Sequence, residues 1–278
     1  MKHIFDKTSY EISKKITRAY STSFSMGIRM LSRHIRPSIY AIYGFVRYAD
    51  EIVDTFHNYH QAELLEDFIT NYDKALTRKI SMNPVLNSFQ EVVHKYELYG
   101  LVDDFIASMR LDLTKKDYHT LDEYEKYIHG SANVVGLMCL KVFLEGDNAQ
   151  YKKLEPYAIK LGSAFQKVNF LRDIRNDIGE LGRSYFPNLT GTELSNQAKD
   201  EIVKDIEADF NQAFVGIRQL PVKARFGVYS AYRYYLHLLH KLKKADSKEL
   251  MHKRIRVSNA MKFFILTKAY LRHIFNKL

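Results

Sequence analysis

Apolar side chains recur along most of the chain with the spacing of an α-helix. They fall three and four residues apart, as in a helix that buries one face, whereas the alternation of a strand is hard to find. The pattern predicts helices over residues 8–32, 37–58, 61–78, 84–98, 101–115, 121–145, 149–179, 194–218, 221–245 and 259–276. We therefore expect an all-α fold.

The prolines and the linkers favour a single domain over residues 1–278. Pro37, Pro156 and Pro221 each open an apolar-periodic stretch, and the first turn of a helix tolerates proline. The linkers are short, and no repeat or shift in composition marks a boundary. The segment 180–195 (ELGRSYFPNLTGTELS) differs, because its glycines and small polar residues predict a long surface loop, and such loops are often lids.

The composition suits a protein with a substantial core. Of the 278 residues, 46% are hydrophobic and 27% charged, with 12 Gly and 5 Pro, which excludes disordered and fibrous classes. The lone Cys139 excludes a disulfide framework and fits a reducing compartment. No signal peptide is recognisable, and no stretch reaches the roughly 18 apolar residues of a membrane span. We expect a cytoplasmic protein.

Positive charge is concentrated at the C-terminal end. The chain has 42 basic and 32 acidic residues, a net charge of +10, and residues 241–278 hold eleven basic residues against Asp246 and Glu249. Since the rest is almost neutral, we expect no nucleic-acid partner. A local anionic partner fits better, either a phosphate group or an acidic membrane surface.

The last part of this stretch, about residues 259–278, predicts a basic amphipathic helix. Such a helix either docks on the protein core or attaches peripherally to an acidic membrane surface, here on the inner face of the membrane. Its apolar positions are Ala260, Phe264, Thr267, Leu271, Ile274 and Leu278, with Phe263 and Phe275 beside them, and its basic positions are Lys262, Lys268, Arg272 and Lys277.

Two carboxylates share one face of the helix predicted over 37–58. Asp50 and Asp54 are four residues apart, so their Cβ atoms lie about 5–6 Å apart. A like-charged pair at this spacing destabilises a helix unless a positive charge lies between them. For one such pair alone, a solvated helix face is the ordinary explanation.

A second oxygen-rich stripe lies in the helix predicted over 149–179. Asn169, Asp173 and Asp177 repeat every four residues, with Gln166 one turn earlier, and apolar residues surround them. Two such stripes on largely buried helices must be neutralised. Oxygen-only ligands are what Mg²⁺ accepts, with Mn²⁺ as an alternative, particularly where substrate phosphates complete the metal's shell.

Arginines lie beside both stripes. Arg47 precedes the first stripe by three residues, and Arg172, Arg175 and Arg183 surround the second. The planar guanidinium group matches pairs of phosphate oxygens. A site for a diphosphate with its metal ions is the simplest physical account.

Four segments resemble one family, the head-to-head prenyl synthases of the squalene/phytoene synthase family, and bacterial phytoene synthases in particular. They are residues 20–24 (YSTSF), 40–54 (YAIYGFVRYADEIVD), 131–138 (SANVVGLM) and 166–187. They follow the family's order along the whole chain, and the paired aspartate motifs are the specific part. The resemblance implies a helical bundle of the isoprenoid synthase type around a central active-site cavity.

The resemblance also implies residue roles, in which Mg²⁺ binds a prenyl diphosphate and stabilises the departing diphosphate. The implied metal ligands are Asp50, Asp54, Asn169, Asp173 and Asp177. The implied catalytic residues are Asp50, Asp54, Asp173, Asp177 and Arg47. The implied substrate-binding residues are Tyr20, Ser21, Thr22, Ser23, Tyr43, Arg47, Gln166, Arg172, Arg183, Tyr235 and Arg254. For the serines and threonine of 21–23, a helix N-cap or an exposed turn is an equal alternative.

The implied reaction joins two geranylgeranyl diphosphates through a cyclopropyl diphosphate intermediate to phytoene, the first step of carotenoid synthesis. Its carbocations need a dry cavity with aromatic walls, for which the chain has 20 Tyr and 17 Phe. The segment 135–138 (VGLM) looks more like phytoene synthases than C30 enzymes, so NADPH is not expected. The alternatives are a C30 dehydrosqualene or squalene synthase that uses farnesyl diphosphate, or a non-catalytic relative.

Three positions depart from the family pattern. Asn133 replaces a glycine, which puts close helix packing in doubt, Glu51 replaces an aspartate, and Arg175-Asn176 replaces a Gly-Glu-like pair. None of these changes removes an implied metal ligand. A non-catalytic relative would tend to lose the paired aspartates, and all of them are present here.

A di-iron carboxylate bundle is the rival from another class of protein. Glu91 and His94, and likewise Glu249 and His252, have the Glu-x-x-His spacing of such sites. However, the second pair lies in the basic stretch, and the first has polar neighbours typical of a surface.

Overall fold

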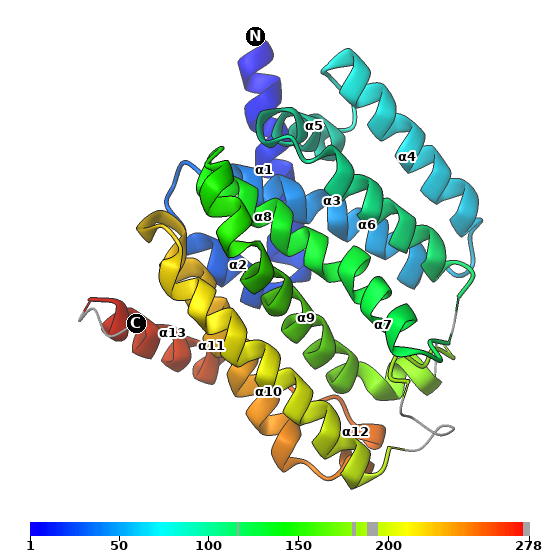
Figure 1. Ribbon diagram of the computed structural model, residues 1–278. Helices are drawn as coiled ribbons and strands as arrows, with labels where there is room; N and C mark the ends of the chain where they lie inside the picture. The colour runs from blue at the N-terminus through cyan, green and yellow to red at the C-terminus, as the bar shows by residue number, and fades with distance from the viewer. Residues whose placement is uncertain (116, 180–181, 188–193, 275–278) are drawn as a thin grey trace.

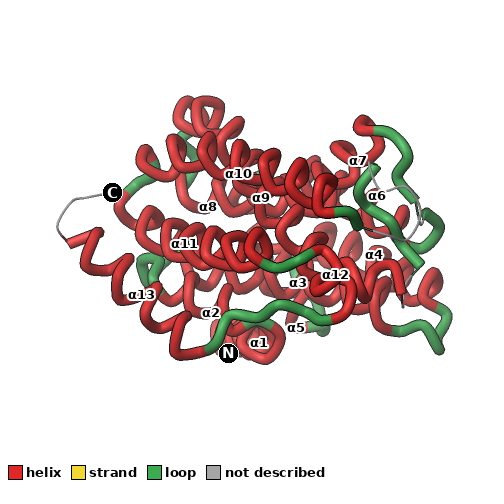
Figure 2. The backbone as a smooth tube through the Cα atoms, turned by 90° about the horizontal axis from the view of Figure 1, so that it is seen from below, coloured by secondary structure: helices red, strands yellow, loops and turns green. Residues whose placement is uncertain are grey.

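The computed structural model is helical throughout the part of the chain that it describes (Figures 1 and 2). Residues 1–115, 117–179, 182–187 and 194–274 are described, and within these ranges no strand occurs beyond a single bridge between Asp117 and Ser184. The prediction of an all-α fold is confirmed.

The helix boundaries agree with the sequence pattern to within a few residues at most ends. The helices are α1 (Lys2–Tyr20), α2 (Thr22–Arg29), α3 (Arg36–Thr55), α4 (Gln61–Arg78), α5 (Pro84–Tyr96), α6 (Tyr99–Asp112), α7 (Leu121–Ile128), the π-helix η1 (His129–Asn133), α8 (Val134–Leu144), α9 (Asn148–Gly179), α10 (Asn196–Gln219), α11 (Val222–Lys244), α12 (Ser247–His252) and α13 (Asn259–Ile274). The short α12 was not predicted.

The helix predicted over 8–32 is two helices. Ser21 is extended, with φ −142° and ψ 107°, and its Oγ accepts a hydrogen bond of 3.1 Å from the Phe24 N–H at the start of α2. Serine is a favoured N-cap because its hydroxyl satisfies a free N–H of the first turn. The small polar residues at 21–23 therefore break the helix and cap the next one.

The helix predicted over 121–145 contains the π-helical turn η1 between α7 and α8. Asn133 lies in this turn, where α9 approaches closely: a Cβ on Gly162 would lie 2.9 Å from the Asn133 Cα. Gly162 on α9 thus allows the close approach of η1 and α9, for which the family pattern has a glycine at the position of Asn133. Leu121–Leu144 is also long and apolar enough to span a membrane, contrary to the expectation above, and 61% of that window is buried inside the fold.

Pro156 does not open a helix as predicted, because α9 already begins at Asn148. The prediction of a surface loop over 180–195 is wrong for part of the described residues, because several of their side chains are buried. Arg183, Tyr185 and Phe186 are buried, and the Tyr185 ring stacks on Phe170 of α9 at a centroid distance of 4.0 Å. Residues 180–181 and 188–193 lie outside the described residues.

Two hydrophobic clusters meet at α9 and α11, which contribute side chains to both. The first joins α3 with α1, α4, α5, α6 and α8, and the Phe45 ring stacks on Phe89 at 4.0 Å in its centre. The second joins α9 with α7, α10 and α11. Figure 1 shows α9 and α10 running side by side across the molecule. The main cavity opens between the two clusters.

A buried ionic cluster joins α9 to α10. Asp209, with 3% of its side chain exposed, pairs with Lys167 at 2.7 Å and Lys160 at 2.8 Å and accepts a hydrogen bond of 2.8 Å from the Ser163 hydroxyl. Lys167 also pairs with Asp205, which is largely exposed. Because Lys167 directly follows Gln166, this cluster fixes the rotation of α9 at the start of the oxygen-rich stripe.

We expect Asp209→Ala to lower the free energy of unfolding by about 3 kcal/mol, since it leaves the buried Lys167 ammonium with only its exposed partner. Asp205→Ala is the matched control and should cost less than about 1 kcal/mol, because an exposed partner is lost. Urea unfolding followed by circular dichroism measures both. Equal losses in the two variants would contradict a structural role for the buried pair.

Candidate active site

The first carboxylate stripe lies on α3 at the polar end of the main cavity. Asp50 lines the cavity and is partly buried, and burial followed by the neighbouring Asp54 charge raises the pKa of its carboxyl well above the ordinary value. Arg47, one turn earlier, donates to Glu51, and its guanidinium carbon lies 4.5 Å from the centre of the Tyr20 ring. Glu51, one of the departures from the family pattern, therefore holds Arg47 at the cavity.

The second stripe lies on α9, and two arginines clamp its central carboxylate. Arg172 donates to both oxygens of Asp173, at 2.9 and 2.5 Å. Arg254, from the segment after α12, approaches the same carboxylate at 2.6 Å through Nε. Both arginines also line the cavity, as does Asn169.

Arg183 ties the two stripes together from the segment that follows α9. Its guanidinium donates to Asp54 of α3 at 2.9 Å, while its backbone N–H donates to the Asp177 carbonyl of α9 at 2.7 Å. Burial raises the pKa of the Asp177 carboxyl to about 8, and the charges of Asp173 and Asp54 add to the effect. The two stripes, more than a hundred residues apart in sequence, thus lie within electrostatic reach of each other.

Sequence reasoning missed Asp112, a fifth carboxylate beside this cluster. It is buried at the end of α6, accepts a hydrogen bond of 2.8 Å from the Tyr127 hydroxyl, and burial raises its pKa to about 7. Arg183 donates to its backbone carbonyl at 2.9 Å. Phe105, Met109 and Asp112 have helical spacing and share the buried face of α6. A carboxylate in phase with apolar residues is the sequence feature that could have indicated Asp112.

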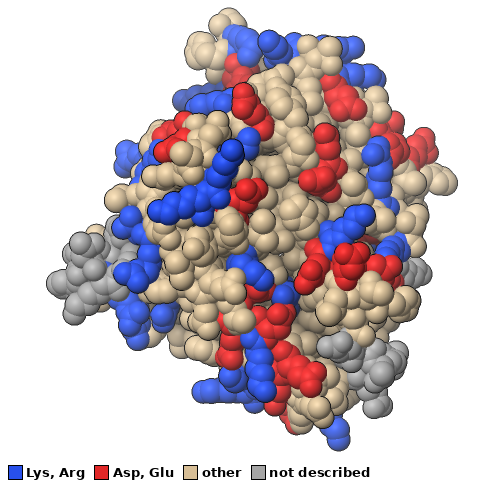
Figure 3. Space-filling model, viewed as in Figure 1, with Lys and Arg blue, Asp and Glu red and all other residues tan. Residues whose placement is uncertain are grey.

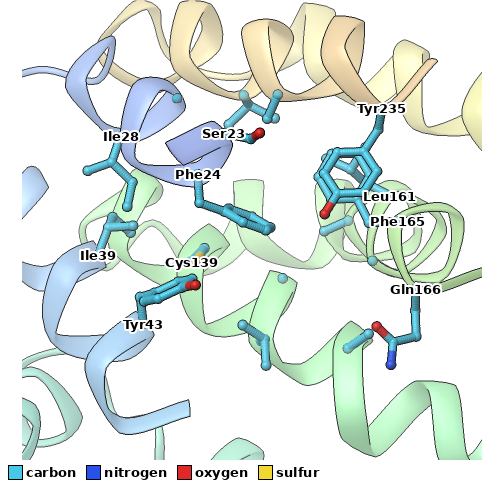
Figure 4. Close-up of a pocket in the computed structure, with 18 of the residues that line it drawn as sticks. Ser23, Phe24, Ile28, Ile39, Tyr43, Cys139, Leu161, Phe165, Gln166 and Tyr235 are labelled. Carbon is cyan, nitrogen blue, oxygen red and sulfur yellow. The ribbon is translucent and has the colours of Figure 1, made fainter. Parts of the chain in front are cut away.

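The cavity has a volume of about 510 Å³, and most of its wall is apolar. Its polar end holds Arg47, Asp50, Asn169, Arg172 and Arg254. The rest is surrounded by side chains from α2, α3, α8, α9, α10 and α11, several of which point into the open space in Figure 4. Apolar residues lining it include Ile28, Leu31, Ile39, Val135, Cys139, Phe143, Leu154, Leu161, Ile217 and Leu220.

Four aromatic rings form one side of the cavity next to its polar end. Phe24 lies between Tyr43 and Tyr235, at centroid distances of 5.8 and 6.1 Å, and Tyr235 stacks on Phe165 at 4.0 Å (Figure 4). Phe24 and Phe165 were not among the predicted site residues. Phe165 precedes Asn169 by four residues, so it extends the same helical stripe backwards.

The structure places most of the predicted site residues at this cavity or directly beside it. Those lining it are Tyr20, Ser21, Ser23, Tyr43, Arg47, Asp50, Gln166, Asn169, Arg172, Tyr235 and Arg254. Those adjoining its polar end are Asp54, Asp173, Asp177 and Arg183. Thr22 differs, because it is exposed and accepts a hydrogen bond of 2.7 Å from Lys262.

Other residues singled out in the sequence lie elsewhere. Arg175 donates to the His252 carbonyl at the end of α12, at 2.6 Å, and so holds that helix instead of the site. Glu91 accepts a hydrogen bond from the Tyr10 hydroxyl, and His94 bonds the Tyr99 hydroxyl at 2.7 Å. Glu91 and His94 thus have hydrogen-bond partners of their own, away from the cavity.

Within the described ranges, no three His, Cys, Asp or Glu side chains are grouped closely enough to hold a metal ion. Asp54 and Asp173 instead pair with arginines. The residues nevertheless fit a hard divalent cation, because all the donors are oxygens. Burial, and after it the neighbouring carboxylates, raises the pKa of Asp50 and of Asp177, so a cation bound there would replace their protons.

Comparison with known proteins gives a consistent picture. Residues 17–260 match the family model for squalene/phytoene synthase. The chain is 28% identical to a 15-cis-phytoene synthase from Synechocystis sp., over 95% of this chain and 85% of that protein. It is 29% identical to a phytoene synthase from Arthrospira platensis, over 95% of this chain and 93% of that protein.

A solved structure shows the same fold. The crystal structure of a dehydrosqualene synthase in complex with ligand superimposes with a TM-score of 0.83, at 22% sequence identity, and covers 96% of this chain and 98% of the other. At that identity the likeness concerns the fold alone. It confirms the predicted helical bundle of this structural type.

The raised pKa values predict how stability depends on pH in the absence of metal. Asp177 holds its proton up to about pH 8 when folded but only to about pH 4 when unfolded, so the folded state binds more protons between these values. The free energy of unfolding should therefore fall as pH rises across this window. In Asp177→Asn, the fall should be smaller.

Thermal unfolding in EDTA and in MgCl₂, at pH 6 and pH 8.5, checks this. Mg²⁺ should raise the Tm more at pH 8.5, where cation binding no longer has to displace protons, and the gain should shrink in Asp177→Asn. The exposed Asp67→Asn serves as control. A Tm that rises from pH 6 to pH 8.5 in EDTA, or an equal Mg²⁺ effect in all three proteins, would contradict the assignment.

Proposed function

Because the chain belongs to the squalene/phytoene synthase family, we propose that it condenses two geranylgeranyl diphosphates head to head into phytoene. The observation that carries this proposal is the polarity of the cavity. Acidic and arginine side chains gather at one end, and apolar and aromatic side chains line the remainder. A long prenyl chain with a diphosphate head matches both parts.

The polar end would hold the diphosphates. Mg²⁺ bound by Asp50, Asp54, Asn169, Asp173 and Asp177 would neutralise charge on the departing diphosphate. Arginine side chains of the protein would also bind the diphosphates. Arg47, Arg172 and Arg254 all face the cavity, and their planar guanidinium groups suit phosphate oxygens.

The apolar part would protect the reacting carbons. The double bond of the second substrate attacks the allylic cation, and loss of a proton closes a cyclopropyl diphosphate. This intermediate loses its diphosphate, rearranges and loses a second proton. Water would trap any of these cations, and the mostly apolar wall of the cavity would exclude it. Phe24, Tyr43, Phe165 and Tyr235 present ring faces beside the polar end, and such faces stabilise positive charge.

A C40 product is favoured over a C30 product by the sequence relatives. The two relatives named above are called phytoene synthases and match 95% of this chain. Loss of a proton completes phytoene without a reductant, so no NADPH is expected. Dehydrosqualene or squalene from farnesyl diphosphate is the second candidate, supported by the likeness in fold to a dehydrosqualene synthase. A non-catalytic role is disfavoured because the paired aspartates are all present.

The proposal extends to where the protein works. Its substrate tails and its product are apolar, so we expect a cytoplasmic protein in peripheral contact with an acidic membrane surface on the inner face of the membrane.

The product is predicted to be a C40 hydrocarbon, formed from geranylgeranyl diphosphate and Mg²⁺ without NADPH. Mass spectrometry after incubation with either geranylgeranyl or farnesyl diphosphate, with and without NADPH, identifies it. A C30 product would move the assignment to the second candidate, and NADPH dependence would separate squalene from dehydrosqualene. No product from folded protein would favour the non-catalytic relative.

Asp50→Ala should reduce turnover by at least about 100-fold, since it removes a group that would hold the Mg²⁺ that neutralises the departing diphosphate. The substitution should not lower the Tm in EDTA, because burial and the Asp54 charge disfavour the ionised carboxyl of Asp50 in the folded protein. Asp173→Ala should also reduce turnover, but with a lower Tm, because Arg172 and Arg254 lose their partner. Asp67→Ala is the exposed control. Near-normal turnover in Asp50→Ala would exclude its assigned role.

A further inference from the structure

Helix α13 docks on the protein by a face that the sequence pattern did not single out. Ala269 is only 2% exposed, Ile265 and Leu266 are partly buried against the second cluster, and Lys262 donates to Thr22 of α2. The helix packs on α11 and lies at the edge of the molecule in both Figure 1 and Figure 2. Docking on the core, one of the two expected arrangements, is therefore observed for this face.

The opposite face of α13 is also apolar. Phe263, Phe264 and Leu271 are 68%, 60% and 49% exposed. Tyr270, 51% exposed, lies at the border of this face, since its ring contacts Phe226 of α11 at a centroid distance of 5.7 Å. An ordinary surface helix carries polar residues opposite its docking face, and large contiguous apolar side chains at a surface mark an interaction site. The predicted apolar stripe of Ala260, Phe264, Thr267 and Leu271 thus faces outward in the structure. Phe275, Lys277 and Leu278 lie outside the described residues.

Positive charge borders this outer face on one side. On the helix, Lys268 lies at its edge, by its spacing from Phe264, while Arg272 donates to the Tyr229 hydroxyl of α11 at 3.5 Å. The chain from residue 241 onward has eleven basic residues against two acidic ones, although Lys243 and Arg254 pair with carboxylates of α10 and α9. In Figure 3, Lys and Arg side chains gather at the left edge, where α13 lies in Figure 1.

The inner face of α13 covers part of the cavity wall. A small second cavity of about 20 Å³ lies beneath the helix, between its Lys262, Ile265 and Leu266 and the helices α2 and α11. Ser23, Gly27 and Tyr234 line both this cavity and the main one. Only a thin layer of α2 and α11 therefore separates α13 from the space proposed for the prenyl chains.

We propose that the outer face of α13, comprising Phe263, Phe264 and Leu271, docks into the surface of an anionic lipid bilayer. The apolar side chains enter the interfacial region, and the basic residues around them contact the acidic headgroups. A second copy of the chain fits less well as the occupant, since two such faces would bring like charges together. The choice of lipid rests in part on the proposed function, because apolar substrates and product would exchange with the bilayer.

Sedimentation with vesicles tests the proposal without substrate. The protein should bind vesicles of phosphatidylcholine with 30% phosphatidylglycerol and bind pure phosphatidylcholine much less. Phe263→Ser, Phe264→Ser and Leu271→Ser combined should weaken binding at least about 10-fold, because the three apolar side chains that would enter the bilayer are lost. The matched control combines Met82→Ser, Leu121→Ser and Val222→Ser, which are exposed elsewhere, and should bind like the parent protein.

Fluorescence gives a second, local readout, because the chain contains no tryptophan. In Phe263→Trp the single indole should shift to shorter wavelength when anionic vesicles are added, whereas in Leu121→Trp it should not. This comparison remains informative if the triple variant fails to fold.

Equal vesicle binding by the triple variant and the control, or no shift in Phe263→Trp, would overturn the proposal. A dimer by light scattering that the triple variant abolishes, without vesicle binding, would assign the face to a second copy instead. Vesicle binding by a protein that gives no C40 product would leave this inference standing and reject the proposed reaction. A C40 product without vesicle binding would support the proposed reaction and reject this inference.

Discussion

Bringing carboxylates together beside an apolar cavity is the constraint on which the rest of the site depends. Burial raises the proton affinity of Asp50, Asp112 and Asp177, and neighbouring carboxylates raise it further. Arg172 compensates from α9 itself, but two further arginines come from outside the helices that carry the aspartates: Arg183 follows α9, and Arg254 follows α12. The acidic cluster therefore fixes two irregular segments against the bundle, and those segments complete the polar end of the cavity.

The neutralisation is incomplete, and this suits binding better than a fully paired cluster would. Both oxygens of Asp173 are engaged by Arg172, and Arg254 adds a further contact, whereas the pKa values of Asp50 and Asp177 remain raised. A site fully paired within the protein would gain little from a cation. Here a cation would take the place of protons on Asp50 and Asp177, and a cation on Asp173 would compete with Arg172 and Arg254, which line the cavity. Metal and diphosphate would thus favour each other's binding.

The sequence was sufficient for the helices and the two aspartate stripes because periodicity is a local property. It could not reveal contacts made across the fold. The burial of Tyr185 depends on stacking against Phe170, and the place of Asp112 in the site depends on Tyr127 and Arg183, which lie on other segments. Helix α13 shows a further limit: both of its faces are apolar, so the pattern alone could not tell which one packs on the core.

A cavity of this size costs the fold packing contacts, since its lining atoms lose their partners on one side. The helices around it compensate by close contact at its margin. A Cβ on Gly216 would lie 2.3 Å from the Cβ of Tyr157, and one on Gly227 would lie 2.4 Å from Leu31 Cδ2. All four residues line the cavity. The helices thus pack closely where they cross and leave a cavity between the crossings. The apolar interior can therefore be rigid and still have space for a prenyl chain.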